Sequence, residues 1–226
     1  MRTIYLTGST GFVGTAFSEY FSRDRIVCHP KTSTVNIGNA SIVVNLAGKA
    51  KDTGGTRNSE EYFHVNYEFA KSVFDAFLES KAEVFITMSS VKAVADSFDG
   101  LLSEDTPPRP ISTYGKSKLL SEQYILSKQL PEGKRVYILR PCIIHGPGNK
   151  GNLSLLYKTV SIGIPWFLGS YNNKRSYCSI ENLLFVLNEL IERKVIPSGI
   201  YHVADDLPLS TNWPEEMSAR QGPPRL

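Results

Sequence analysis

The sequence predicts an α/β fold built on a doubly wound parallel sheet. Two observations predict it: short apolar runs alternate with longer segments of helical periodicity, and a glycine-rich turn joins the first apolar run to the first helical segment. A chain of 226 residues suits one domain, or one domain with a small lobe attached. We therefore expect a single sheet with helices on both of its faces.

The predicted elements follow one another in a regular order. Apolar runs of strand length lie at residues 2–7, 26–28, 42–46, 84–88, 135–139 and 199–203. Segments with apolar residues at helical spacing lie at 12–21, 60–80, 112–128, around 153–160, and at 181–193. The link between the second and third strands has room for a brief strand near 35–37, but not for a full crossover helix. Pro107, Pro108 and Pro110 predict a loop.

Composition and charge exclude several classes of partner. The formal net charge is only +3 and the chain has no basic run, so we expect no nucleic-acid partner. No apolar run reaches the roughly 18 residues of a membrane span, and the N-terminus enters a strand at once, so we expect neither a membrane segment nor a secretory signal. Cys28, Cys142 and Cys178 lack metal-ligand spacing. They predict reduced thiols in a cytoplasmic protein without a metal site.

The turn after the first strand carries glycines three residues apart, at Gly8, Gly11 and Gly14. This spacing permits a tight turn, close approach of the backbone to a pyrophosphate, and tight packing of helix on strand. The helix that follows presents its N-terminal N–H groups and the positive end of its dipole to the phosphates. The turn predicts dinucleotide binding, with a purely structural turn as the alternative. The residues assigned to the cofactor here are Gly8, Thr10, Gly11, Phe12, Val13 and Gly14.

The GxxGxxG spacing of this turn resembles that of the extended short-chain dehydrogenase/reductase superfamily. The resemblance implies a Rossmann-type fold and a nicotinamide cofactor. It also implies that Leu46, Ala47 and Gly48 lie against the adenine-ribose side of the cofactor, and that Pro141 lies near the nicotinamide. Asn66 sits where the superfamily uses an asparagine to fix the sheet centre, so we assign it to the cofactor site. An ordinary exposed helix asparagine is the alternative.

The resemblance also divides the chain. It implies a Rossmann core at residues 1–141 and a mixture of core and substrate-lobe segments at 142–211. Residues 212–226 are rich in proline and charge and depart from the superfamily pattern. We expect them to form an atypical, disordered tail beside a small, truncated C-terminal substrate lobe. By resemblance alone, the helices at 60–80 and 112–128 are expected to pair in a homodimer.

The second strand does not settle which dinucleotide is bound. NAD-specific members usually end this strand with an acid that accepts a hydrogen bond from the ribose 2′-hydroxyl. Here the strand runs into Cys28, His29, Pro30 and Lys31, without an acid. Lys31 could neutralise a 2′-phosphate, which favours NADP over NAD. A solvated surface lysine is the alternative, so both cofactors stay open.

Tyr114 and Lys118 are four residues apart and so lie on one face of a predicted helix. A phenol with a pKa near ~10 is a poor base at neutral pH, and a neighbouring ammonium lowers that pKa by favouring the phenolate. Ser89 and Ser90 end a strand, where a hydroxyl can bond the same substrate oxygen. We assign catalysis to Ser90, Tyr114 and Lys118, and substrate contacts to Ser89 and Ser90. An amphipathic helix surface is the alternative.

The stretch that follows Tyr114, up to Glu122, resembles the sugar-nucleotide epimerase/dehydratase branch of the superfamily. Within that branch, 4,6-dehydratases carry an Asp-Glu pair just after the serine, and Val91 and Lys92 occupy those positions here. The chain therefore lacks the acid and base of a dehydratase. A nucleotide-sugar 4-epimerase or 4-keto-reductase remains, with hydride transfer at sugar carbon 4 and a UDP-(N-acetyl)hexosamine as the expected substrate.

Two polar residues are expected to hold the substrate diphosphate. Asn152 resembles the asparagine that contacts the diphosphate in this branch, and Arg175 resembles the arginine that grips it through bidentate, charge-assisted bonds. An exposed arginine in a turn is the alternative for Arg175. His145 lies in a glycine-rich loop, where a structural role is favoured over that of a general acid.

Two further functions stay open. One is a non-catalytic dinucleotide-binding module that lacks a complete substrate lobe. The other is an alcohol dehydrogenase or reductase that acts on a non-sugar substrate. The intact set of Ser90, Tyr114 and Lys118 argues against the first, and the expected diphosphate contacts argue against the second.

Overall fold

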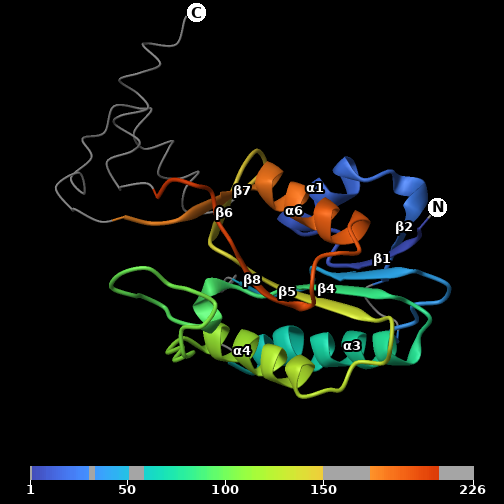
Figure 1. Cartoon of the computed structure of the whole chain (residues 1–226), viewed down its shortest axis with the longest axis horizontal. Coiled ribbons are helices and arrows are strands. Elements are labelled where there is room, and N and C mark those ends of the chain that lie inside the picture. Colours follow the sequence, from blue (N-terminus) through green and yellow to red (C-terminus); the bar gives the residue numbers. More distant parts are fainter. Residues whose placement is uncertain (1, 31–33, 51–58, 150–173, 209–226) are drawn as a thin grey trace, which may run out of the picture.

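The computed structural model describes residues 2–30, 34–50, 59–149 and 174–208. Six parallel strands form one sheet in the order β2-β1-β3-β4-β5-β8 (Figure 1). Their bounds are β1 (Ile4–Thr7), β2 (Ile26–Cys28), β3 (Ile42–Asn45), β4 (Val84–Met88), β5 (Arg135–Pro141) and β8 (Gly199–Val203). A second, smaller parallel sheet pairs β6 (Ile143–His145) with β7 (Tyr177–Ser179). The predicted α/β fold with a doubly wound parallel sheet is confirmed.

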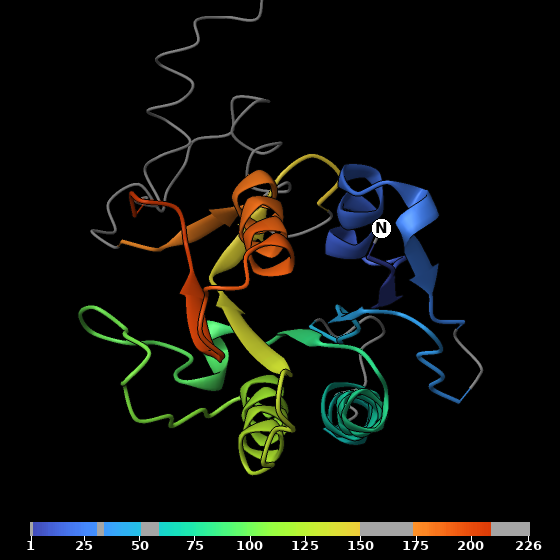
Figure 2. The same cartoon turned by 45° about the vertical axis from the view of Figure 1, so that its right-hand side comes forward.

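Helices cover both faces of the main sheet (Figures 1 and 2). One face carries α1 (Phe12–Tyr20) and α6 (Ile180–Glu192). The other carries α4 (Thr113–Leu126) and a continuous helix made of α2 (Ser59–Phe63), the π-helical turn η2 (His64–Phe69) and α3 (Ala70–Glu79). Single 3₁₀ turns occur at η1 (Arg23–Arg25) and η3 (Val91–Ala93).

The alternation of side chains along each strand builds two separate cores. Ile4 and Leu6 point toward α1 and α6, whereas Tyr5 between them points toward α3 and α4. Because both faces are covered, the central strands are apolar without interruption, as in the fully buried Ile42–Val44 run of β3.

The strand order places a change in crossover direction at the carboxyl ends of β1 and β3. The chain leaves β1 into α1 on one face of the sheet, and it leaves β3 into α2–α3 on the other face. The loops after these neighbouring strands therefore diverge. In doubly wound folds this topological switch point is where ligands bind.

Most predicted elements are confirmed, and the differences have local causes. The strands at 26–28, 84–88 and 199–203 form with the predicted bounds, and the other described elements agree to within two residues at each end. The brief strand near 35–37 does not form: Asn36 Oδ1 accepts the Gly38 N–H at 3.0 Å in a turn where Gly38 has φ +58°. The small sheet β6–β7 was not predicted. The helix expected around 153–160 lies outside the described residues.

Elements beyond residue 141 complete the main sheet. The edge strand β8 pairs with β5 from Tyr137–Gly199 to Pro141–Val203. Helix α6 buries Leu183, Leu187 and Ile191 against the same core as α1. The sheet and its core therefore draw on chain segments from both sides of residue 141.

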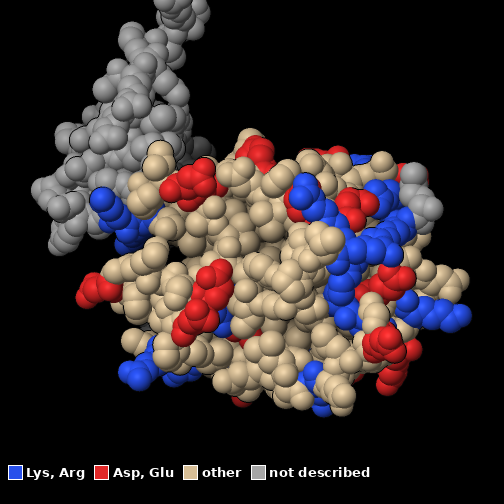
Figure 3. Space-filling view, in the orientation of Figure 1, with Lys and Arg blue, Asp and Glu red and all other residues tan. Residues whose placement is uncertain are grey.

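Charged side chains of both signs share the surface. On the face shown in Figure 3, Lys and Arg gather on the right, with Asp and Glu placed between them. Ion pairs such as Arg2–Glu83 and Arg25–Glu192 join the two signs. Within the described ranges, no helix has both the length and the apolarity that crossing a bilayer requires.

Candidate functional site

The glycine turn between β1 and α1 packs directly on the loop that follows β3. Gly8 has φ +71°, and a Cβ there would lie 2.5 Å from Ala47 N and from the Leu46 carbonyl carbon. A Cβ on Gly14 would lie 2.1 Å from the Gly8 carbonyl oxygen. Neither position can hold a side chain unless the backbone moves. The turn is therefore as compact as the predicted dinucleotide site requires.

The N-terminus of α1 faces this turn without a side-chain cap. Gly11 is the extended N-cap residue, and it makes no side-chain cap bond to the first turn in the part of the chain that the structure describes. Thr10 and Gly11 are exposed, whereas the side chains of Phe12 and Val13 pack against the core and leave their backbone to form the first turn. Such a helix terminus favours an anion.

A chain of hydrogen bonds ties the carboxyl ends of three strands together. Thr7 Oγ1 donates to Asn45 Oδ1 at 2.5 Å, and Asn45 Nδ2 donates to Thr87 Oγ1 at 3.2 Å. Thr7 Oγ1 also accepts the Ala47 N–H at 3.3 Å, which holds the loop of Leu46–Gly48 in place. Thr7, Asn45 and Thr87 were not among the predicted site residues. The signal was present, because each polar residue stands at or near the end of an apolar strand.

Asn66 lies on the π-helical turn η2 and is 1% exposed, so it is not an ordinary exposed asparagine. Its Oδ1 accepts the Lys49 N–H at 2.8 Å, and its Nδ2 donates to the Lys49 carbonyl at 3.0 Å. Nδ2 also donates to Ser117 Oγ at 3.0 Å. Asn66 thus joins the loop after β3 to α4, next to Lys118.

Lys118 extends from α4 under the loop after β3. Its Nζ donates to the Met88 carbonyl at 2.7 Å, and a Cβ on Gly48 would lie 3.1 Å from this Nζ. Burial lowers the pKa of Lys118 to about 8, against the negative charge of Glu122, which raises it. Lys118 thus carries its charge at neutral pH, although its pKa lies only slightly above neutral pH.

Ser90 and Tyr114 meet beside Lys118. Burial raises the pKa of the Tyr114 phenol, and a hydrogen bond with the Ser90 side chain lowers it in part. Ser90 Oγ also accepts the Lys92 N–H at 3.2 Å and so caps η3. A Cβ on Gly115 would lie 2.3 Å from the Lys92 carbonyl oxygen, so α4 begins in direct contact with η3. The three residues predicted to be catalytic therefore lie at one end of β4.

Ser89 has a different partner from the substrate that the sequence suggested. It is 5% exposed, and its Oγ donates to Glu122 Oε1 inside the protein. The hydroxyl proton is therefore committed to a carboxylate on α4, and we withdraw Ser89 from the substrate contacts. Glu122 was overlooked because its partners are distant in the sequence.

The remaining residues predicted for the cofactor and for the substrate are described only in part. Arg175 is exposed, and Pro141 is buried at the end of β5 opposite Val203. Asn152 and Lys31 lie outside the described residues.

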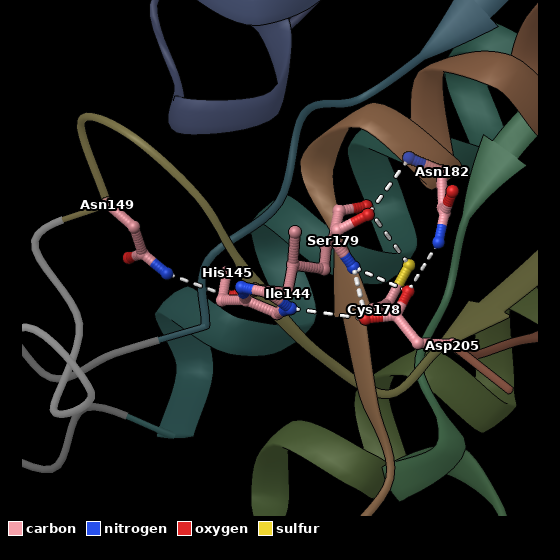
Figure 4. Close-up of polar contacts among 7 residues, drawn as sticks. All are labelled: Ile144, His145, Asn149, Cys178, Ser179, Asn182 and Asp205. Carbon is pink, nitrogen blue, oxygen red and sulfur yellow. Dashed lines mark hydrogen bonds and ion pairs between the residues drawn. The ribbon is translucent and has the colours of Figure 1, made fainter. Parts of the chain in front are cut away.

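His145 belongs to a polar cluster that joins β6, β7 and the segment after β8 (Figure 4). Its Nε2 lies 3.2 Å from Asp205 Oδ2, and Asp205 Oδ1 accepts the Ser179 N–H at 2.9 Å and Asn182 Nδ2 at 2.8 Å. Burial raises the pKa of Asp205, but these hydrogen bonds together outweigh burial and hold it below its usual range. The contacts favour the structural interpretation of His145.

Comparison with protein families decides the relationship. A model of the NAD dependent epimerase/dehydratase family matches residues 4–204. The chain belongs to this family. Its members are enzymes of the extended short-chain dehydrogenase/reductase type, as the glycine turn and the Tyr114–Lys118 pair had indicated.

Curated relatives include both sugar and steroid enzymes. The chain is 30% identical to a UDP-glucose 4-epimerase of Vibrio cholerae, with coverage of 93% of this chain and 73% of the relative. It is 25% identical to N-acetyl-alpha-D-glucosaminyl-diphospho-ditrans,octacis-undecaprenol 4-epimerase of Escherichia coli O157:H7, with coverage of 92% and 69%. It is also 25% identical to a 3-beta-hydroxysteroid dehydrogenase of Mycolicibacterium neoaurum, with coverage of 92% and 66%.

Solved structures share the fold and differ in cofactor. MoeE5 in complex with UDP-glucose and NAD superimposes with a TM-score of 0.81 at 22% identity, covering 96% of this chain and 81% of that one. RMD from Pseudomonas aeruginosa complexed with NADPH has a TM-score of 0.75 at 18% identity, with coverage of 97% and 82%. At these identities the likeness concerns the fold alone, so the choice between NAD and NADP stays open.

Proposed function

We propose that this protein is a nucleotide-sugar 4-epimerase or 4-keto-reductase that acts at sugar carbon 4 with a bound nicotinamide cofactor. The favoured substrate is a UDP-(N-acetyl)hexosamine. The UDP-glucose 4-epimerase of Vibrio cholerae, at 30% identity, supports this choice over the steroid enzymes. The absence of a dehydratase acid pair at Val91 and Lys92 supports simple hydride chemistry.

One observation carries the proposal: an unbroken series of contacts joins the glycine turn to the catalytic set. Gly8 packs on Leu46 and Ala47, and Lys118 Nζ lies against the next residue, Gly48. From Lys118 the series continues through the Met88 carbonyl to the end of β4, where Ser90 meets Tyr114. A cofactor held by the turn would therefore lie beside the residues that handle the proton.

The turn fits a dinucleotide because a Cβ at Gly8 or Gly14 would fill it, and because α1 presents an uncapped N-terminus. Bound there, a nicotinamide cofactor would supply a reversible hydride acceptor. We propose that the residues holding it are Gly8, Thr10, Gly11, Phe12, Val13, Gly14, Leu46, Ala47, Gly48, Asn66, Tyr114, Lys118 and Pro141. For Asn66 the contacts support an indirect role, through the backbone of Lys49.

The proton chemistry falls to three side chains. Tyr114 gives a proton to the oxygen on sugar carbon 4, or takes it away, as the carbon is reduced or oxidised. Ser90 bonds the same oxygen. The charged Lys118 favours the phenolate and clamps the nicotinamide ribose. On the substrate side we propose contacts from Ser90, Asn152 and Arg175.

In the decisive experiment, the purified protein is incubated with UDP-glucose, UDP-N-acetylglucosamine, a UDP-4-keto-hexose or a sterol. Each incubation is run without added cofactor and with the oxidised or the reduced form of NAD or NADP. Products are separated by chromatography, and absorbance is followed at the nicotinamide band. Formation of the 4-epimer without net change in cofactor supports an epimerase. Cofactor consumption that requires a 4-keto sugar supports a reductase, and the better of NADH and NADPH decides the cofactor.

The same experiment separates the alternatives. If the protein binds a dinucleotide but neither binds nor converts any nucleotide sugar, the result would indicate a non-catalytic dinucleotide-binding module. Turnover of a sterol in the same assay would indicate a dehydrogenase for a non-sugar alcohol. The cytoplasmic location and the homodimer through α2–α3 and α4 remain predictions, the second of which sedimentation in solution would test.

A further inference from the structure

A buried ion pair lies one helical turn beyond Lys118, on α4. Arg140 Nη2 donates to Glu122 Oε2 at 2.6 Å, and Arg140 Nε donates to Glu122 Oε1 at 3.0 Å. The two side chains are 4% and 2% exposed, and no other ion pair among the described residues has both partners buried to this degree. Burying two charges carries a desolvation cost, so stability alone is a weak reason for the pair.

The third contact of Glu122 reaches the segment that carries Ser90. Ser89 Oγ donates to Glu122 Oε1, and the Ser89 N–H donates to the Leu139 carbonyl at 2.7 Å. Ser89 is therefore held by its side chain and by its backbone. Both bonds restrain the backbone immediately before Ser90.

Each segment that Glu122 joins carries a residue of the proposed catalytic or cofactor set. These residues are Lys118, one helical turn before Glu122 on α4, Ser90 beside Ser89, and Pro141 beside Arg140. The Met88 carbonyl, which accepts from Lys118 Nζ, immediately precedes Ser89. One carboxylate thus sets the spacing of α4, the end of β4 and the end of β5.

We propose that Glu122 is the positioning residue of the catalytic centre, and that through Ser89 and Arg140 it holds Ser90 and Lys118 in register. The inference rests on the function proposed above. Glu122 does not act on the substrate; it acts through its neighbours, and its loss should reduce turnover more than substrate binding.

The charge of Glu122 adds a second effect. It opposes the lowering of the Lys118 pKa by burial. Three other charged or titratable groups lie nearby in the described part of the chain: Arg140 on β5, His202 on β8, and Glu104. His202 Nε2 lies 3.5 Å from Arg140 Nη1, and Glu104 accepts the His202 backbone N–H. Without the carboxylate, Lys118 would lose its proton at a lower pH, and the unpaired Arg140 charge would act in the same direction.

The test compares Glu122→Gln with Ser89→Ala. The first keeps the volume of the side chain and removes its charge, and the second removes only the link to the end of β4. We expect kcat to fall at least about tenfold in Glu122→Gln and about threefold in Ser89→Ala, with KM for the nucleotide sugar within about twofold of the parent value.

The alkaline limb of the kcat profile should move about one pH unit lower in Glu122→Gln. Glu192→Gln, which breaks the more exposed pair with Arg25, is the matched control and should change neither.

Parent kcat and an unchanged pH profile in both variants would overturn the proposal and leave an ion pair with a structural role only. If Glu122→Gln does not fold, Ser89→Ala decides on kcat alone. A protein that turns over no nucleotide sugar would contradict the proposed function instead. In that case the ionisation of Lys118 still tests the role of Glu122. The free energy of unfolding of Glu122→Gln is measured as a function of pH relative to that of the double variant Glu122→Gln/Lys118→Met. This difference should begin to rise at a pH below about 8, because the pKa of Lys118 is lower without the carboxylate. A rise that still begins near 8 would count against the role of Glu122.

Discussion

Burial sets the protonation of the catalytic pair at the scale of single residues. It raises the pKa of Tyr114 and lowers that of Lys118 to about 8, so in both cases it favours the uncharged form. Near neutral pH, Tyr114 therefore holds the proton that it would give to a sugar oxygen. Lys118 still carries the charge that would assist the release of this proton.

Replacement of Tyr114 by Phe should abolish turnover while leaving dinucleotide binding intact. The phenol supplies the proton, and positioned acid–base groups contribute about 10²–10⁴-fold in rate. We expect kcat to fall at least about 100-fold and the dissociation constant for the dinucleotide, from nicotinamide fluorescence, to change by less than about twofold. Tyr20→Phe removes an exposed phenol at the far end of α1 and serves as control. Substantial turnover by Tyr114→Phe would exclude this residue as the acid–base group.

Lys118 should make the stability of the protein depend on pH. Its pKa is about 8 in the folded state against 10.5 as its model value, so between these values the unfolded state binds more protons. The free energy of unfolding should rise with pH across this window, by on the order of 3 kcal/mol relative to Lys118→Met. Below pH 8 the two proteins should run parallel. Urea unfolding of both proteins at pH 7, 8 and 10 measures the effect, and equal slopes throughout would contradict it.

For individual residues, local spacing predicted which side chains share a helix face, but it did not predict their hydrogen-bond partners. Tyr114 and Lys118 lie four residues apart on α4, and the helix alone places them on one face. Ser89 and Ser90 are neighbours in the sequence, and Ser89 bonds Glu122, which is 33 residues away. No local pattern contains that distance.

At the scale of elements, Lys134 closes the C-terminal end of α3. Its Nζ donates to the carbonyls of Phe77, Ser80 and Ala82 at 2.9, 2.8 and 2.7 Å. A cation at this end also complements the helix dipole. One lysine thus fixes the connection from α3 to β4, which carries the serines of the proposed site.

Lys134→Met should destabilise the fold by about 1–3 kcal/mol, because three carbonyl groups lose a charged donor while the apolar part of the side chain is kept. The midpoint and slope of urea unfolding measure the loss. Lys128→Met is the matched control, since Lys128 lies over the Tyr124 ring at 4.8 Å on an exposed position, and it should cost less than about 0.5 kcal/mol. Equal losses in both variants would show that the carbonyl contacts contribute little.

The strongly periodic elements could be predicted, and the short ones could not. The spacing of apolar residues predicts helix α6 and strand β4. Strands β6 and β7 have three residues each and exist because they pair with one another across more than thirty residues of chain. Such pairing leaves no periodic signal within either segment.

In the whole molecule, elements from the C-terminal part of the chain pack against elements from the N-terminal part. Helix α6 packs beside α1, and β8 extends the sheet next to β5 (Figure 2). The glycine turn therefore depends on packing that the N-terminal segments alone do not complete.

Leu187→Ala should destabilise the entire protein by about 2–5 kcal/mol, because Leu187 is 0% exposed in the core between α6 and the sheet. Thermal and urea unfolding should both show one cooperative transition at a lower midpoint. Phe185→Ala on the same helix is 57% exposed in its parent form and should shift stability by less than about 0.5 kcal/mol. A separate early transition in Leu187→Ala would mean that α6 unfolds independently of the sheet.

Features that depend on neighbouring residues were predictable from the sequence: the glycine turn at Gly8, the alternation of strands and helices, and the Tyr114–Lys118 pair. Backbone conformation and helical spacing act over a few residues, so a linear sequence displays them. The folded structure was needed to show that Asn66 holds the backbone of Lys49 and that Glu122 joins Ser89 to Arg140. Buried polar groups need hydrogen-bond partners, and these partners lie far apart along the chain, so local spacing does not reveal them.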